Sequence, residues 1–441
     1  MSRKIIYCAL AVLVTLGSMP VMADVTTGNA PSSAKNVKVY GDAQVTGLTM
    51  STSLSQGAAF MGNNLEPDDA TPEGAAVAQL HAKLGFEITL GSKCFAVVEF
   101  ENKLDDAAGN LANFIGNMEY GNTGLGAAYV KAEEFLVNNL SFSVGIMPYA
   151  TDLRGNNQPF LLSTTQTSLS RTVISDMGGW VATYHSGSNL AVDLLMLKLT
   201  ETVGNREDMD IYGVHVDYKL ASNSDATRRV INVNLLVNND QSANGQYYTI
   251  GGGADYSLNP NLELYGELYF QTGEIADGVD QSALALYFGA KWTANTPLKP
   301  YLDASLWYLT GDDATSAENE DFLHLDNVHQ ALILEDPAFG FDYSTNMLAL
   351  KFMAGASWDK AILQKPLSLD AFLGWYSLQE DNGGDGTVGL ELDIMTSWYA
   401  SDSLTFSLGL GYLFSSDLLK AVTVDAEDSG SILVFDTALK F

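Results

Sequence analysis

Apolar and polar residues alternate along most of this chain. In residues 404–414, LTFSLGLGYLF, large apolar side chains occupy the even positions, and Thr, Ser or Gly occupies most odd positions. The stretches 262–271, 367–375 and 388–398 follow the same period of two. Successive side chains of a strand point to opposite faces, so each stretch predicts a strand with one apolar and one polar face.

The same pattern recurs in roughly eighteen stretches, and sixteen is the alternative count. Either number is even and falls in the range of bacterial outer-membrane barrels. The chain shows no convincing helical period after its first 23 residues. The predicted strands are 37–49, 76–90, 93–101, 124–135, 138–147, 177–186, 188–200, 209–221, 226–237, 246–258, 261–272, 281–294, 299–310, 345–359, 367–379, 387–400, 403–415 and 430–441.

The links between these stretches alternate in length. The long links are 50–75, 102–123, 148–176, 311–344 and 416–429, and short links such as 91–92, 259–261 and 400–402 lie between them. If the first strand runs outward, all five long links fall on the outer side. Long outer loops and short periplasmic turns are typical of outer-membrane barrels, whereas a soluble β-sandwich has no reason to sort its loops in this way. Several outer links, such as GDDATSAENED (311–321), are acidic and rich in turn residues, and they need not fold into anything compact.

Both ends of the chain fit this interpretation. Arg3 and Lys4 precede a short apolar run and small residues up to Ala23, which predicts a signal peptide over residues 1–23 and a barrel over 24–441. No later stretch approaches the roughly 18 continuous apolar residues of a membrane-spanning helix. The chain ends on Phe441. A terminal strand that ends in Phe resembles the signal by which outer-membrane proteins reach their insertion machinery.

The formal net charge is −31, although 46% of the residues are hydrophobic. Such an excess of acid excludes nucleic acid as a partner, because binding it depends on Lys and Arg at the phosphates. An acidic but apolar chain is either a large soluble β protein or a barrel with alternate residues facing lipid. We favour the second: an all-β transmembrane antiparallel β-barrel with outer-membrane lipid and lipopolysaccharide as its surroundings.

The second half of the chain resembles the alginate-export family of outer-membrane porins. The resemblance rests on YGELYFQTGE (265–274), PYLDASLWYLTGDD (300–313), STNMLALKF (344–352) and GLELDIMTSWYASDSLTFSLGLGYLF (389–414). It implies an eighteen-strand barrel in the bacterial outer membrane. It does not extend to alginate as the substrate, because a channel for a polyanion needs a lumen lined with Arg and Lys.

By parity, the charged side chains predicted to face the lumen are more often acidic than basic. Rings of carboxylates favour cations in a pore, so we expect a passive diffusion channel for small hydrophilic solutes with a weak cation preference. A channel for a polysaccharide or oligosaccharide is the alternative. The candidate lining and selectivity residues are Glu263, Tyr265, Glu267, Tyr269, Gln271, Asp303, Asp370, Glu391, Asp393, Lys291 and Lys351.

The long link 148–176 is the candidate constriction loop. It carries Arg154 and Arg171 in a neutral setting rich in Gln, Asn and Thr. We expect this loop to fold inward, with both arginines facing the acidic wall.

Two other classes of protein are alternatives to a channel: an outer-membrane enzyme and a structural wall protein. An outer-membrane enzyme needs a nucleophile or an activated water beside an oriented base, and none of the five histidines lies in such a signature. A structural wall protein with a plugged lumen predicts no conductance. We expect no enzyme activity, no cofactor and no metal site.

Overall fold

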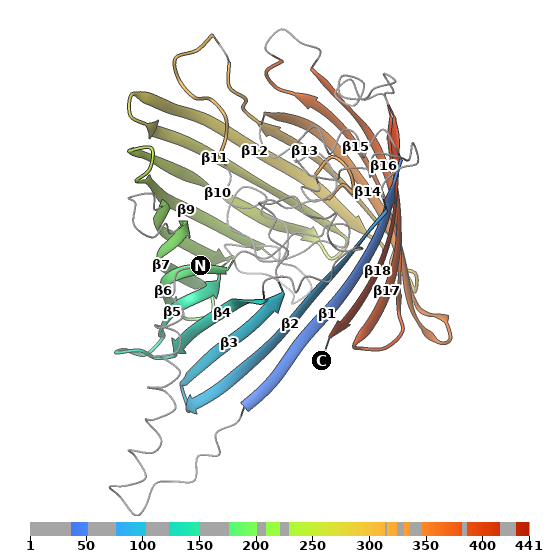
Figure 1. Cartoon of the computed structure of the whole chain (residues 1–441), viewed down its shortest axis with the longest axis horizontal. Helices are drawn as coiled ribbons and strands as arrows, with labels where there is room; N and C mark the ends of the chain where they lie inside the picture. The colour runs from blue at the N-terminus through green and yellow to red at the C-terminus, as the bar shows by residue number, and fades with distance from the viewer. Residues whose placement is uncertain are drawn as a thin grey trace, which may run out of the picture.

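The computed structural model describes residues 37–51, 76–102, 123–149, 176–200, 209–220, 229–313, 315–323, 330–335, 346–381, 386–414 and 429–440. Eighteen antiparallel strands form one sheet, which confirms the predicted count (Figure 1). They are β1 (Val37–Met50), β2 (Ala76–Gly91), β3 (Cys94–Asn102), β4 (Thr123–Ala132), β5 (Leu140–Pro148), β6 (Asp176–Ser186), β7 (Leu190–Thr200), β8 (Met209–Lys219), β9 (Arg229–Asp240), β10 (Gly245–Asn259), β11 (Leu262–Ala276), β12 (Val279–Thr293), β13 (Tyr301–Leu309), β14 (Met347–Ile362), β15 (Lys365–Leu378), β16 (Thr387–Tyr399), β17 (Leu404–Phe414) and β18 (Gly430–Lys440).

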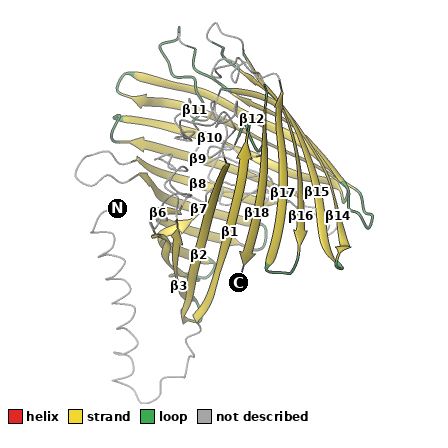
Figure 2. Cartoon of the chain, turned by 45° about the vertical axis from the view of Figure 1, so that its right-hand side comes forward, coloured by secondary structure: helices red, strands yellow, loops and turns green. Residues whose placement is uncertain are grey.

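The sheet closes on itself. Each strand pairs with the next along the chain, and β1 also pairs with β18, in a register that sets Asp42 opposite Lys440 and Met50 opposite Ile432. Figure 2 shows β1 lying between β2 and β18. Closure leaves no free strand edge, which is the condition under which a sheet can span lipid. Phe441 and the predicted signal peptide lie outside the described residues.

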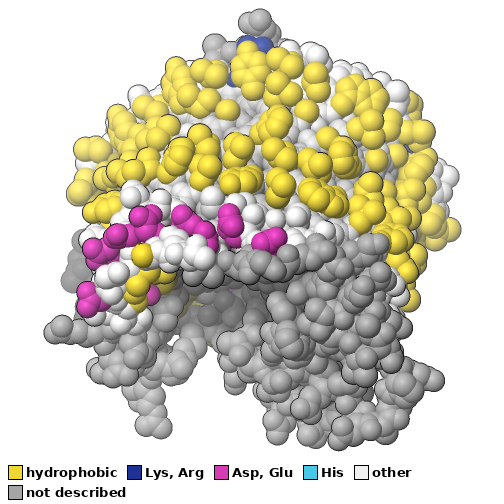
Figure 3. All heavy atoms as spheres, turned by 90° about the horizontal axis from the view of Figure 1, so that it is seen from above, with side chains coloured by type: hydrophobic (Ala, Val, Ile, Leu, Met, Phe, Trp, Pro, Cys, Tyr) yellow, Lys and Arg dark blue, Asp and Glu magenta, His cyan; other side chains and the backbone are white. Residues whose placement is uncertain are grey.

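The exposure of the side chains is the reverse of that in a water-soluble protein. In β17, Leu410 is 52% exposed, while the neighbouring Gly409 and Gly411 face inward and are buried. In β11, the exposed positions include Leu268 and Phe270, and the buried face carries polar side chains. Hydrophobic side chains cover the outer surface of the strands, and Asp and Glu side chains gather along one rim (Figure 3). The predicted alternation therefore has its apolar side outward, as lipid requires.

Glycines allow close strand contact where β5 pairs with β6. Gly145 of β5 and Gly179 of β6 are paired in register and have positive φ angles of 134° and 156°. A Cβ atom on Gly145 would lie 2.1 Å from the carbonyl oxygen of Ala128 on β4, and one on Gly179 would lie 2.1 Å from that of Met196 on β7. Only glycine fits this geometry without strain.

The lengths of the links agree with the prediction in part, since the rim of short turns also carries the longer link 220–228. The periplasmic rim carries short turns such as 92–93, 187–189, 260–261 and 363–364. The opposite rim carries the five predicted long links, but it also carries the tight hairpin turns 241–244 and 277–278. Asn244 and Gly278 adopt positive φ in these two turns, which permits the tight reversal.

No described helix is long and apolar enough to cross a membrane.

Candidate functional site

The β13–β14 connection folds into the barrel. Its residues 319–323 lie on the inner face of β11 and β12. There the Gln281 Nε2 atom donates to the carbonyl oxygen of Asp321 over 2.8 Å, and the Leu323 N–H donates to the Gln271 side-chain oxygen over 2.8 Å. Phe322 is fully buried beside them. The acidic links need not have been compact, but this part of the β13–β14 connection packs against the wall.

A second part of the same connection, residues 330–335, lies against the inner wall farther round the barrel. The Ile333 and Leu334 N–H groups donate to the two carboxylate oxygens of Glu391 over 2.7 and 2.8 Å. The Leu332 N–H donates to Asp393 over 3.0 Å. Both acids are fully buried on β16. These three hydrogen bonds hold the segment against the wall.

Glu335 is the last residue of this segment, and its two carboxylate oxygens have different partners. One carboxylate oxygen accepts the N–H groups of Gln330 and Ala331, over 2.7 and 3.1 Å. The other pairs with the ammonium of Lys351 on β14. The Lys351 side chain is only 1% exposed, and its Nζ atom lies 3.4 Å from the centroid of the Trp307 ring. An aromatic face attracts a desolvated cation, so this ion pair has a third partner. We call residues 330–335 the inner segment.

Tyrosines and a tryptophan line the wall beside the inner segment. The ring centroids of Tyr265 and Tyr287 lie 5.2 Å apart, and those of Tyr287 and Trp307 lie 4.4 Å apart. The Tyr265 hydroxyl donates to Asp303, and the Tyr301 hydroxyl donates to Asp370 over 2.7 Å. Each of these acids is therefore oriented by a phenol from another strand.

A separate polar network lies on β7, β8, β9 and β11. The two ring nitrogens of His215 lie 2.5 Å from Asn234 Oδ1 and 3.1 Å from an Asp217 oxygen, so both nitrogens face acceptors. The Asn234 amide donates to the Tyr269 hydroxyl over 3.1 Å. Tyr149, which follows β5, donates to Asp193 over 2.9 Å. An imidazole between two acceptors is best satisfied with a proton on each nitrogen.

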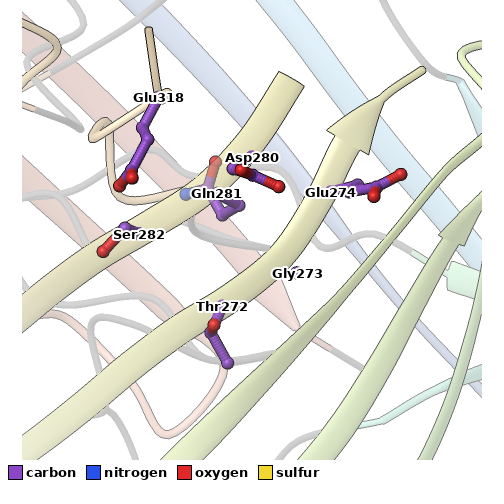
Figure 4. Close-up of a pocket in the computed structure, with 7 residues that line it drawn as sticks. All are labelled: Thr272, Gly273, Glu274, Asp280, Gln281, Ser282 and Glu318. Carbon is purple, nitrogen blue, oxygen red and sulfur yellow. The ribbon is translucent and has the colours of Figure 1, made fainter. Parts of the chain in front are cut away.

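The outer end of β11 and β12 holds a small pocket of about 450 Å³. Figure 4 shows Glu274, Asp280 and Glu318 around it, with Gln281 between the two strands and the β13–β14 connection. Asp313, in the same connection, accepts the backbone N–H of Thr315, and this hydrogen bond holds the pKa of its carboxyl below the usual value. The outer entrance on this side is thus acidic.

The structure places the predicted lining residues on the inner face. Glu267, Tyr269 and Gln271 are buried there on β11, and Glu263 and Tyr265 continue the same face toward the periplasmic rim. Lys291 lies over the Tyr301 ring, with its Nζ atom 4.8 Å from the centroid. Their part in selectivity stays a prediction.

Three predicted lining residues have a role that the sequence did not suggest. Glu391, Asp393 and Lys351 face inward as expected, but they hold the inner segment instead of lining open water. The missed signal is the apolar run Ala331–Leu334, which is out of place in an acidic outer loop. Arg154, Arg171 and most of the link 148–176 lie outside the described residues, so the proposed constriction there stays a prediction. Within the described ranges, no group of three or more His, Cys, Asp or Glu side chains is placed to hold a metal ion.

Comparison with known sequences gives one family match. Residues 175–319, which include β6 to β13, match the family described as YfaZ precursor. This match covers less than half of the chain, and it does not support the resemblance to the alginate-export family. No curated protein matches.

Solved structures match over nearly the whole chain. OccK9 (OpdG) of Pseudomonas aeruginosa has a TM-score of 0.55 at 13% identity, over 92% of this chain and 99% of its own. OccK2 (OpdF) of the same organism, solved in complex with glucuronate, has a TM-score of 0.54 at 13% identity, over 94% and 100%. OccK1 (OpdK), also from P. aeruginosa, has a TM-score of 0.52 at 11% identity, over 92% and 98%. At these identities the likeness concerns the fold, and the chain has the closed eighteen-strand fold of porins of the bacterial outer membrane.

Proposed function

We propose that this protein is a passive channel for small hydrophilic solutes across the outer membrane, with a preference for cations. The observation that carries the proposal is the charge of the inner wall. Carboxylates on the inner faces of the strands outnumber the described inward lysines, and they recur from β2 round to β15: Glu87, Glu99, Asp193, Asp217, Asp255, Glu263, Glu267, Asp303 and Asp370. A lumen lined by one sign of charge concentrates ions of the other sign.

The inward lysines do little to offset this charge. Lys83 pairs with Glu99 over 2.9 Å. Lys351 is enclosed with Glu335. Each of these cations is matched by a carboxylate of its own, which leaves the other inward acids to set the potential of the lumen.

The charge of the wall also guides the choice of test solutes. OccK2 (OpdF) was solved in complex with glucuronate, an anion, whereas the acidic wall of this protein favours the opposite charge. Glucosamine, a cation at neutral pH, and glucuronate are sugars of similar size and therefore make a suitable pair of test solutes.

The experiment is solute uptake into liposomes that contain the purified protein. We expect glucosamine to be taken up several-fold faster than glucuronate at low salt, because electrostatic focusing changes association rates by roughly tenfold or more. The double variant Glu263→Gln, Glu267→Gln should reduce this ratio. Asp359→Asn is the control, since Asp359 is an exposed residue that pairs with Lys299 at the periplasmic end of β14. Faster uptake of glucuronate would contradict the proposal and favour the alternative, a channel for anionic saccharides.

A further inference from the structure

Two periplasmic turns carry exposed leucines at their tips. Leu136, in the turn 133–139 between β4 and β5, is 84% exposed, and Leu363, between β14 and β15, is 80% exposed. Among the large apolar side chains of the described strands, the exposed fraction reaches only 57%, at Val233 and Leu302. Each tip thus exposes a larger fraction of its apolar side chain than the lipid-facing wall does.

The backbone at these tips does not favour leucine. The φ angles of Leu136, Leu363 and Gln364 are 64°, 51° and 62°. A two-residue hairpin turn with positive φ at both positions is usually made by Asn and Gly, because other side chains are strained there. Leucine therefore costs stability within the turn, and its apolar side chain requires a partner outside the protein to offset that cost.

The end of the β14–β15 hairpin bends toward lipid. The register of β13 with β14 ends at Gly355, so residues 359–366, which we call the β14–β15 tip, extend past β13. The Trp398 Nε1 atom donates to the carbonyl oxygen of Ile362 over 3.3 Å. Trp398 lies on the outer face of β16, and its ring is stacked on that of Phe406, with the centroids 5.7 Å apart. The tip therefore lies beside lipid-facing aromatic side chains of the kind that favour the membrane boundary.

The turn 133–139 also leans on the outer face. The rings of Phe135 and Phe142 are stacked with centroids 5.2 Å apart, and those of Phe142 and Trp180 lie 6.1 Å apart. Phe142 and Trp180 face lipid, since they share the face of the exposed Val144. Phe135 thus continues an aromatic row of the outer wall into the turn.

The charges around the β14–β15 tip suit a phospholipid surface. Lys360 and Lys365 are exposed on either side of Leu363, and Asp359 pairs with Lys299 over 3.2 Å. A lysine at a membrane boundary lays its stem along apolar surface and keeps its ammonium in the polar layer. Apolar side chains between two lysines fit an anionic phospholipid surface, which offers both an apolar layer and phosphates.

We propose that the turn 133–139 and the β14–β15 tip are lipid anchors, which place Leu136 and Leu363 among the phospholipids of the periplasmic leaflet. Both are continuous with the lipid-facing wall through their aromatic contacts. β5 and β14 are nine strands apart in a ring of eighteen, so the anchors lie on opposite sides of the barrel (Figure 1). Anchors on opposite sides fix the depth and the tilt of the barrel. The proposed channel function is not needed for this role.

Fluorescence quenching tests the position of each tip. Leu136→Cys and Leu363→Cys are made singly in a Cys94→Ser background, because Cys94 is a free cysteine, and are labelled with the fluorophore NBD. In vesicles of phosphatidylethanolamine and phosphatidylglycerol, we expect nitroxide-bearing lipids to quench both labels several-fold more than iodide present on both sides. Ser188→Cys, in the exposed turn 187–189 of the same rim, is the control and should show the reverse. Stronger quenching by iodide at either leucine position would overturn the anchor there and leave that tip open to a periplasmic protein.

A substitution at the tip gives opposite results in lipid and in water. Asn adopts positive φ more readily than Leu, so Leu363→Asn would raise the urea midpoint of the folded barrel if the tip lay in water. In the same vesicles we expect this variant to lower the midpoint, because it removes an apolar side chain from lipid. Gln364→Asn is the matched control: it eases the neighbouring backbone position without this loss and should not lower the midpoint. A midpoint for Leu363→Asn at or above that of the wild type would overturn the anchor.

Discussion

At the scale of single residues, the direction of each side chain decides its role. Glu391 and Asp393 occupy alternate positions on β16, so both face inward, while the residues next to them face lipid. The same acids that sequence reasoning assigns to ion selectivity accept backbone N–H groups from the inner segment. A carboxylate on the inner wall can therefore attract a mobile cation or hold a piece of the chain, and its partners decide which.

The paired glycines allow a prediction at this scale. Gly179→Ala should destabilise the barrel by about 1–3 kcal/mol, because the new Cβ atom would meet the carbonyl oxygen of Met196 and the backbone would have to adopt a strained φ. The measurement is the urea midpoint at which the folded band disappears on an unheated SDS gel. Gly178→Ala is the control, since nothing lies within 4 Å of a Cβ atom there. Equal midpoints for the two variants would show that the close approach of β6 and β7 carries no strain.

At the scale of elements, β18 has the special task of closing the barrel. Val434 of β18 lies opposite Leu48 of β1 and opposite Gly409 of β17. The first and last strands are therefore neighbours within one continuous sheet. The described parts of the β13–β14 connection, in contrast, lie inside the closed barrel and occupy part of its interior. Backbone pairing with β1 and β17 holds β18 in place, and hydrogen bonds to wall side chains hold the inner segment.

Closure can be tested by a single substitution. Val434→Pro removes a backbone N–H between two paired strands and should prevent closure, because proline is not tolerated inside a sheet. We expect loss of the folded band and increased proteolysis of the whole chain. Val434→Ala, which shortens the same side chain but keeps the N–H, should retain the folded band. A folded band of wild-type intensity for Val434→Pro would show that the β1–β18 seam is not needed for the barrel.

At the scale of the whole molecule, the strands could be predicted from the sequence and the inner segment could not. The alternation in β11, β16 and β17 is local, because lipid on one side and polar groups on the other constrain every second residue. The inner segment has no such period: Leu332 meets Asp393 only after the sheet has closed, across 61 positions of sequence. For the same reason, parity placed Lys351 and Glu391 on the correct face but could not reveal what covers them.

The whole molecule is a closed cylinder with an apolar outer surface, and we propose that its acidic lumen conducts cations. The most direct test is the zero-current potential of single channels in a KCl gradient across a planar bilayer. We predict stepwise conductance and a potential of the sign that shows K⁺ to be more permeant than Cl⁻. A potential of the opposite sign, or a membrane without conductance steps, would contradict the proposed cation channel.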